Sequence, residues 1–267
     1  MPAFDIAMAS CSEPGQRDAN EDALCTGQVE VDRHATNYAV LADGAGGHER
    51  GAEAARRVVE GVEAGLRLGQ GQGQTAFAPA GLSGVLRAVH AELQQLQDGA
   101  QGRARMHATV VVLWLDTAHD RALWSHVGDS RLFRLRYGAV DRVTADDSVV
   151  QRLLERGVLT TEQAQTHPLK SQLLAAMGMQ DSVEPHTIDT PQRLEDGDAF
   201  LLCSDGWWGA LSDAELAATL ADADTPQAWL DAMRRLILAR ATPRQDNFSA
   251  IAVWVSDPLE STRSMAD

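Results

Sequence analysis

The stretch "YAVLADGAGGHERG", Tyr38–Gly51, decides how the rest of the chain is interpreted. An apolar run ends at Asp43, three glycines follow within four residues, and His48 comes next. A single Asp-Gly pair after a strand is ordinarily a turn, because both residues favour turn conformations. The pattern gains weight because other parts of the chain repeat it.

Aspartates recur where apolar runs end or begin. The runs "ALWSHVGDS" and "FLLCSDG" also end at an aspartate, Asp129 and Asp205. In "RQDNFSAIAVWV" Asp246 comes just before the apolar part, and in "RDANEDA" Asp22 comes just before a predicted strand. In an antiparallel sandwich, the end of one strand lies beside the start of its neighbour. We therefore expect one rim of the sheets to gather Asp43, Asp205 and Asp246, with Asp22 nearby.

Carboxylates gathered in this way need cations. Two of them about 4 Å apart repel by roughly 4 kcal/mol at an effective dielectric constant of 20. Ligand sets made only of oxygen favour Mg²⁺, Mn²⁺ or Ca²⁺ over zinc. The glycines then acquire a purpose: Gly44 can turn its carbonyl towards a metal, while Gly46 and Gly47 let the chain pass closely.

The predicted elements alternate in blocks. β-Branched content and bounding turn residues predict strands over 4–10, 23–31, 37–42, 109–116, 121–127, 132–136, 199–204 and 248–255. A hairpin is predicted at Tyr137-Gly138. Apolar residues at helical spacing predict helices over 51–68, 81–97, 147–157, 212–220 and 225–241.

The order of these elements indicates the fold class. A strict βαβα alternation is absent, so we predict an α+β fold in which antiparallel sheets pack together with helices outside. Residues 143–179 lie between strands and are expected to form a polar, partly helical flap beside the site. The Gly/Gln-rich segment 68–81 is interpreted as a linker. We expect one catalytic domain over 1–256 and a loose tail over 257–267.

Composition excludes several classes. Of 267 residues 44% are hydrophobic, yet no long uncharged apolar run predicts a membrane helix. A net charge of −15 argues against binding nucleic acid or an anionic membrane. The three cysteines, Cys11, Cys25 and Cys203, show no metal-ligand spacing and are expected to be reduced and buried. These features, with no recognisable signal peptide, predict a cytoplasmic protein.

Six motifs in this order resemble the metal-dependent type 2C serine/threonine protein phosphatases, bacterial branch. They are "RDANEDA", "LADGAGGHERG", "HVGDSRLFRL", "VTADDSVVQRLLERGVLTTEQAQTHP", "LLCSDGWW" and "QDNFSAIAV", and the resemblance runs from about Cys11 to Val255. It implies a four-layer α-β-β-α sandwich with two Mn²⁺ or Mg²⁺ ions at one end and a third, weaker ion.

The resemblance also implies residue roles. Asp43 matches the ligand that bridges both metals, and the Gly44 carbonyl matches a ligand of the second. Asp205 and Asp246 match the other ligands of the first metal, and Asp129 matches a ligand of the third. Glu21 and Asp22 match the acidic pair that binds metal-bound waters. Arg17 matches the arginine that holds the substrate phosphate. His48 and Asn247 are expected to support the ligands.

These assignments imply a reaction. Two divalent ions lower the pKa of a bridging water towards about 7, so that hydroxide can attack phosphorus in line with the leaving serine or threonine oxygen. The planar guanidinium of Arg17 can bind two phosphoryl oxygens. Phosphorylated proteins are the implied substrates, and a bacterial kinase is the implied opponent. We expect a monomer, with neither nucleic acid nor membrane as a partner.

Some positions depart from the family pattern. Ala45 stands where the family has Met or His, and His107–Thr109 replaces a "GTT" strand opening. In the flap, Asp146–Ser148 and Leu169–Gln172 differ, which leaves substrate choice open. Separately, Trp207 and Trp208 are candidate walls of the active-site cleft.

Two rival classes remain open. One is a catalytically silent homologue that binds phosphoproteins; the complete ligand set and Arg17 argue against it. The other is a two-metal nuclease or a structural calcium binder, which the net charge and the lack of a "DxDxDG" loop oppose. Hydrolysis of p-nitrophenyl phosphate with Mn²⁺, with Ca²⁺ and with EDTA separates these classes.

Overall fold

The computed structural model describes residues 3–44, 50–68, 76–97 and 105–258. Its strands are β1 Asp5–Glu13, β2 Asp22–Val31, β3 His34–Asp43, β4 Val110–Asp116, β5 Arg121–Val127, β6 Arg131–Arg136, β7 Ala139–Arg142, β8 His186–Thr187, β9 Gln192–Arg193, β10 Ala199–Cys203 and β11 Phe248–Ser256. Its helices are α1 Gly51–Leu68, α2 Pro79–Leu96, α3 Val149–Glu155, α4 Thr161–Gln165, α5 Asp205–Trp208, α6 Asp213–Ala221 and α7 Pro226–Ala239.

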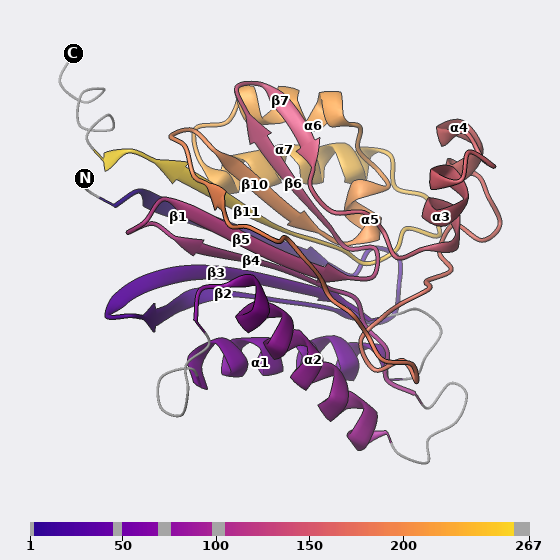
Figure 1. Ribbon diagram of the computed structural model, residues 1–267. Coiled ribbons are helices and arrows are strands. Elements are labelled where there is room, and N and C mark those ends of the chain that lie inside the picture. Colours follow the sequence, from indigo (N-terminus) through magenta and orange to yellow (C-terminus); the bar gives the residue numbers. More distant parts are fainter. Residues whose placement is uncertain (1–2, 45–49, 69–75, 98–104, 259–267) are drawn as a thin grey trace.

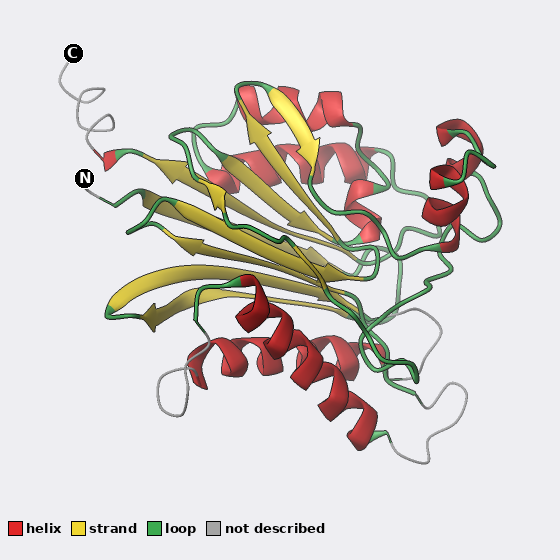
Figure 2. Cartoon of the chain, in the orientation of Figure 1, coloured by secondary structure: helices red, strands yellow, loops and turns green. Residues whose placement is uncertain are grey.

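Two antiparallel sheets form the middle of the molecule. Within the described residues, one sheet has the order β1-β11-β10-β6-β7, and the other has β2-β3-β4-β5-β8 with β9 also pairing with β5. Figures 1 and 2 show α1 and α2 below the second sheet and α6 and α7 above the first. The predicted α-β-β-α sandwich is therefore confirmed.

Three apolar layers hold the sandwich together. Period-two alternation sends Leu41 into the core between the sheets, while Val40 faces α1 and α2. In β10, Leu202 likewise faces the other sheet, and Leu201 faces α7. All seven residues of β4 are buried because both faces of that strand are covered. Covered faces also explain why the central strands are almost uninterrupted apolar runs.

Local signals set several element boundaries, including the predicted hairpin at Tyr137-Gly138. The turn between β6 and β7 has positive φ at Tyr137 and Gly138 (51° and 79°), as a two-residue hairpin requires. Ser212 and Glu215 form a reciprocal capping box at the start of α6. A second such box, at Thr160 and Gln163, starts the short helix α4, which the sequence analysis did not separate from the rest of the flap.

The described part of the chain contains no helix that is both long and apolar enough to cross a bilayer. The three cysteines are free thiols, and Cys203 is buried while Cys11 and Cys25 are partly exposed. Burial raises the pKa of the Cys25 thiol to about 12. The expectation that all three are buried is thus wrong for two of them.

Candidate metal centre

The β2–β3 pairing sets the first two acidic side chains beside each other. Asp22 begins β2, Asp43 ends β3, and the two residues are direct partners across the antiparallel ladder. Same-face partners in such a ladder have Cβ atoms about 4.5–5.5 Å apart. The aspartates that bound these two apolar strands therefore lie together at one end of this sheet.

Two neighbouring strands of the other sheet bring further aspartates to the same place. Asp205 follows β10, Asp246 precedes β11, and these strands pair directly. The link between the sheets is a hydroxyl: Ser204 Oγ donates to Asp22 Oδ2 at 2.9 Å and accepts from the Ser249 backbone N–H at 3.0 Å. We call Asp22, Asp43, Asp129, Asp205 and Asp246 the carboxylate rim.

Tight backbone packing at the rim leaves no room for larger residues. A Cβ atom at Gly206 would lie 2.1 Å from the backbone oxygen of Asn247. Glycine is therefore required beside Asp205 if the chains before α5 and before β11 are to approach this closely. The Asp-Gly sequence that looks like a simple turn serves here to bring two acidic segments together.

A buried hydroxyl pair fixes the backbone of Asp43. Thr109 Oγ1 accepts from the Asp43 N–H at 3.0 Å, and the Thr109 N–H donates to the Asp43 carbonyl at 2.8 Å. Ser130 Oγ lies 2.7 Å from Thr109 Oγ1. The unusual opening His107–Thr109 thus retains Thr109, the residue that holds Asp43, and His107 itself is buried.

Asn247 holds the loop that carries Arg17. Its side-chain oxygen accepts from the Glu21 N–H, and its side-chain nitrogen donates to the carbonyls of Pro14 and Ala19, all at 2.9 Å. These three contacts fit the supporting role expected for Asn247, which stays a prediction. The sequence around Asn247 does not show which atoms it contacts, because its partners are main-chain atoms more than 200 positions away.

Arg17 reaches the rim from that loop. Its Nη2 donates to Asp246 Oδ2 at 2.7 Å, and the two side chains remain 57% and 43% exposed. A guanidinium at this position can also meet a phosphate that approaches from solvent. The Glu21 carboxylate lies against Gly51, the first residue of α1, where an added Cβ would be 2.9 Å from its Oε2.

Asp129 belongs to a neighbouring part of the rim. It follows β5, is buried, and its carbonyl accepts from the indole N–H of Trp208 at 2.9 Å. Arg131 stacks over that indole at 3.4 Å and forms two hydrogen bonds to Asp146 in the flap, at 3.0 and 2.7 Å. Trp208 therefore supports the site. Trp207 is fully buried against Phe248, so its predicted role as a cleft wall is wrong.

Burial and proximity make four of the rim carboxyl groups, those of Asp22, Asp43, Asp129 and Asp205, hard to ionise. Burial raises the pKa of Asp22 and of Asp205 to about 6 each, and nearby charge, chiefly that of Asp246, adds to the effect. Burial and the charge of Asp205 raise the pKa of Asp129 to about 8. The pKa of Asp43 is raised well above its usual range by burial and by its acidic neighbours.

The donor set fits hard divalent cations. Oδ1 of Asp22 is buried and has no hydrogen-bond partner among the residues that the structure describes. A buried carboxylate oxygen without a donor is costly unless a cation occupies its lone pairs. A rim whose described acidic side chains offer only oxygen atoms suits Mg²⁺ or Mn²⁺.

Other predicted features lie outside the rim or outside the described residues. Ala45, Gly46, Gly47 and His48 are not described. Gly44 is, and its N–H donates to the Glu21 carbonyl at 3.0 Å. A cavity of about 640 Å³ lies behind the flap between β6, β7 and α3, but none of the rim aspartates lines it.

Lys170 is a flap residue that the sequence analysis left without a role. It is the only lysine in the chain and is exposed, and its charge lowers the pKa of Asp205, opposing the larger effects of burial and of Asp246. The flap thus brings a positive charge towards the carboxylate rim. The signal in the sequence that could have drawn attention to Lys170 is that no other lysine is present.

Comparisons with known proteins agree with this geometry. A sequence model described as "Protein phosphatase 2C" matches residues 15–245. The serine/threonine protein phosphatase PstP of Mycobacterium tuberculosis is 31% identical over 238 residues, which are 89% of this chain but 42% of that protein. The serine/threonine phosphatase stp of Listeria innocua is 28% identical over 242 residues, 89% of this chain and 90% of that one.

Solved structures share the whole architecture. The catalytic domain of PstP in complex with two manganese ions superposes with a TM-score of 0.77 at 28% identity, covering 95% of this chain and 100% of that one. The chain thus spans less than half of the full-length Mycobacterium tuberculosis relative, but matches all of this catalytic-domain structure.

Proposed function

The chain belongs to the protein phosphatase 2C family, and from this premise we propose that it hydrolyses phosphoserine and phosphothreonine in proteins, opposing a bacterial serine/threonine kinase. The observation that carries the proposal is the carboxylate rim, where buried acidic groups converge and Arg17 lies at the exposed edge. Such a rim requires cations, and a cation-lined edge with an arginine suits a phosphoryl group.

Each rim residue has a proposed part. Asp43, Asp205 and Asp246, with the Gly44 carbonyl, would hold two Mn²⁺ or Mg²⁺ ions, Asp22 and Glu21 would orient waters around them, and Asp129 would hold a third ion. When bound, the ions supply Lewis acidity and lower the pKa of a water molecule to near neutrality. Ser204, Thr109 and Asn247 keep the acidic side chains and their backbones in position.

The assay that tests this function uses a phosphothreonine peptide. We expect phosphate release with Mn²⁺ or Mg²⁺ and none with EDTA, because the rim aspartates repel one another and cannot bind a phosphate without cations. Release that persists unchanged in EDTA would contradict the proposal. Binding of the peptide without hydrolysis would identify a silent phosphoprotein binder, and cleavage of DNA or RNA would identify a nuclease.

Replacing Arg17 tests the substrate side of the rim. Arg17→Ala should lower kcat/KM for the phosphopeptide about 10- to 100-fold, since a charge-assisted contact contributes about 1.5–3 kcal/mol. Arg17→Lys should recover part of the loss, because it keeps the charge without the planar fork. Steady-state kinetics at saturating Mn²⁺ provide the measurement.

The matched control is Arg244→Ala, which removes an exposed positive charge two residues from Asp246. It should change kcat/KM by less than about threefold, as expected for an exposed surface charge. A different result would reassign Arg17: if Arg17→Ala altered only the Mn²⁺ affinity and left the peptide KM and kcat unchanged, Arg17 would be a counter-ion of Asp246 and not a phosphate ligand.

A further inference from the structure

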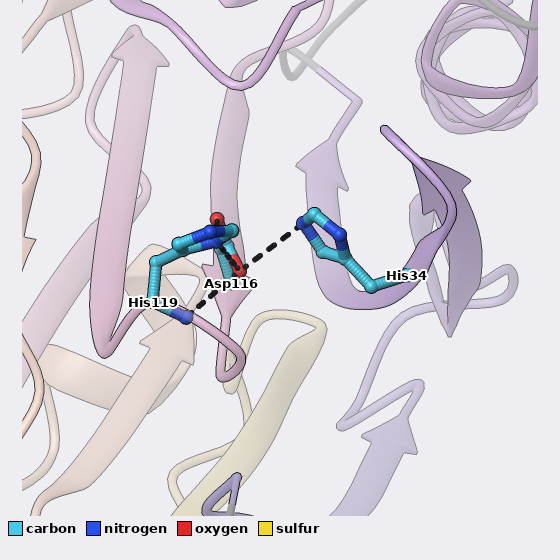
Figure 3. A group of neighbouring side chains, drawn as sticks. All are labelled: His34, Asp116 and His119. Carbon is cyan, nitrogen blue, oxygen red and sulfur yellow. Dashed lines mark hydrogen bonds and ion pairs between the residues drawn. The ribbon is translucent and has the colours of Figure 1, made fainter. Parts of the chain in front are cut away.

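We propose that His34, Asp116 and His119 form a second metal site, of the kind that takes Zn²⁺, at the end of the sandwich away from the carboxylate rim (Figure 3). His34 begins β3 and Asp43 ends it, so that nine residue steps separate the two locations. At about 3.3 Å per residue this distance is roughly 30 Å. The two sites therefore share no ligand.

Hairpin geometry brings the three residues together. Positive φ at Asp32 and Arg33 (49° and 71°) closes the turn that leads into His34. In the β3–β4 ladder Asn37 is opposite Leu115. When the same antiparallel register is extended past the end of β4, His34 comes opposite position 118, next to His119. Asp116 ends β4 and accepts from the His119 backbone N–H at 3.3 Å, which folds the loop back over the carboxylate.

The potential ligand atoms converge on one carboxylate. One ligand atom from each residue can be chosen so that all lie within 4.8 Å of one another. His119 Nδ1 is 3.1 Å from Asp116 Oδ1, and His34 Nε2 is 3.7 Å from the same oxygen. Figure 3 shows the two imidazoles approaching Asp116 from different strand ends. Small rotations of two partly exposed rings would bring all three atoms to metal-bonding distance.

The donor chemistry favours an imidazole-binding metal. Two imidazole nitrogens and one carboxylate oxygen are a common three-ligand set for Zn²⁺, with the fourth position left to water. Mg²⁺ and Mn²⁺ prefer oxygen ligands, so this cluster and the carboxylate rim should select different metals. The side chain of His119 is 53% exposed, which leaves the fourth position open to solvent.

A neighbouring arginine orients the carboxylate. Arg121 Nη2 donates to Asp116 Oδ2 at 2.5 Å, while the Asp116 side chain is fully buried. Oδ1, the oxygen nearer to His34, is left for the metal. Hydrogen bonds of this kind hold metal-binding carboxylates in place. The alternative occupant of the cluster is a proton shared between His119 Nδ1 and Asp116, which lie 2.9 Å apart.

Zinc titration separates the metal from the proton. Calorimetry in saturating Mg²⁺ keeps the carboxylate rim occupied while Zn²⁺ is added to the wild type, His34→Ala, His119→Ala and the size-preserving His119→Gln. The matched control is His167→Ala, a flap histidine outside the cluster. Unfolding midpoints in EDTA establish that each variant is folded, and midpoints with Zn²⁺ provide a second readout.

We expect the wild type and His167→Ala to bind one Zn²⁺ and to unfold at a higher temperature when it is present. Loss of an outer contact to a metal ligand already costs about 10- to 100-fold in affinity, so removal of either histidine should weaken binding by about 100-fold or more. Zn²⁺ binding that is equal in His119→Ala and the wild type, or absent in the wild type, would overturn the proposal.

Discussion

Replacing Asp205 with asparagine should lower Mn²⁺-dependent turnover by at least about 100-fold, equivalent to about 2.7 kcal/mol in barrier height. Asparagine keeps the size and one oxygen but removes the negative charge from a partly buried position between β10 and β11, where we propose that Asp205 holds a metal. The same change should stabilise the metal-free protein. Burial and Asp246 raise the pKa of Asp205 to about 6 from 3.8, so its ionisation at neutral pH opposes folding by about 1–3 kcal/mol.

Kinetics over a Mn²⁺ titration and urea unfolding in EDTA measure the two effects. Asp224→Asn serves as the matched control, because it neutralises an exposed aspartate far from the rim in the sequence. It should leave both quantities within experimental error. Turnover of Asp205→Asn within tenfold of the wild type at saturating Mn²⁺ would remove Asp205 from the ligand set.

The stability of the metal-free protein should fall as the pH rises. The folded-state pKa values of Asp22, Asp129 and Asp205, at about 6, 8 and 6, lie above the ordinary 3.8. The folded chain therefore binds more protons than the unfolded chain between about pH 4 and pH 8, and deprotonation favours unfolding. We expect a loss of about 3 kcal/mol between pH 5.5 and pH 8, equivalent to about two pKa units at 1.36 kcal/mol each.

Urea unfolding in EDTA at both pH values tests this slope. Asp129→Asn should flatten it, because that variant removes the group whose pKa is raised most among the three. Saturating Mn²⁺ should also flatten or reverse the slope, since the metal binds the deprotonated rim. A metal-free protein that is equally stable at both pH values would show that the folded-state pKa values of these aspartates are not raised by burial and neighbouring charge.

Much of the fold could be predicted because its local signals agree. The central strand 121–127 was predicted at its observed bounds, and the 109–116 strand differed by one residue. These strands are buried on both faces, so their sequences are apolar throughout. The strands β8 and β9 are not predicted from the sequence, because each has only two residues and is defined by its pairing with β5 more than by its own residues.

Part of the site could also be predicted from the sequence, and part could not. The recurrence of aspartates at strand ends predicted the rim, because antiparallel pairing forces such ends together. Ser204, by contrast, has no local signal: its role depends on Asp22, 182 positions away, whose Oδ2 lies 2.9 Å from the Ser204 hydroxyl. The metal-binding roles of the individual rim residues remain predictions, as do the limits of the catalytic domain at 1–256 and the monomeric state.

The single lysine of the flap has a practical consequence. Lys170 is the one side-chain amine of the sequence, so an amine-reactive ester, which also modifies the α-amino group, can place a label on the flap without mutagenesis. A fluorophore placed there would report flap movement when Mn²⁺ or a phosphopeptide arrives. Those molecules that couple to an amine-reactive resin through Lys170 would be attached by the flap, with the rim crowded, so immobilised preparations should be made through another chemistry.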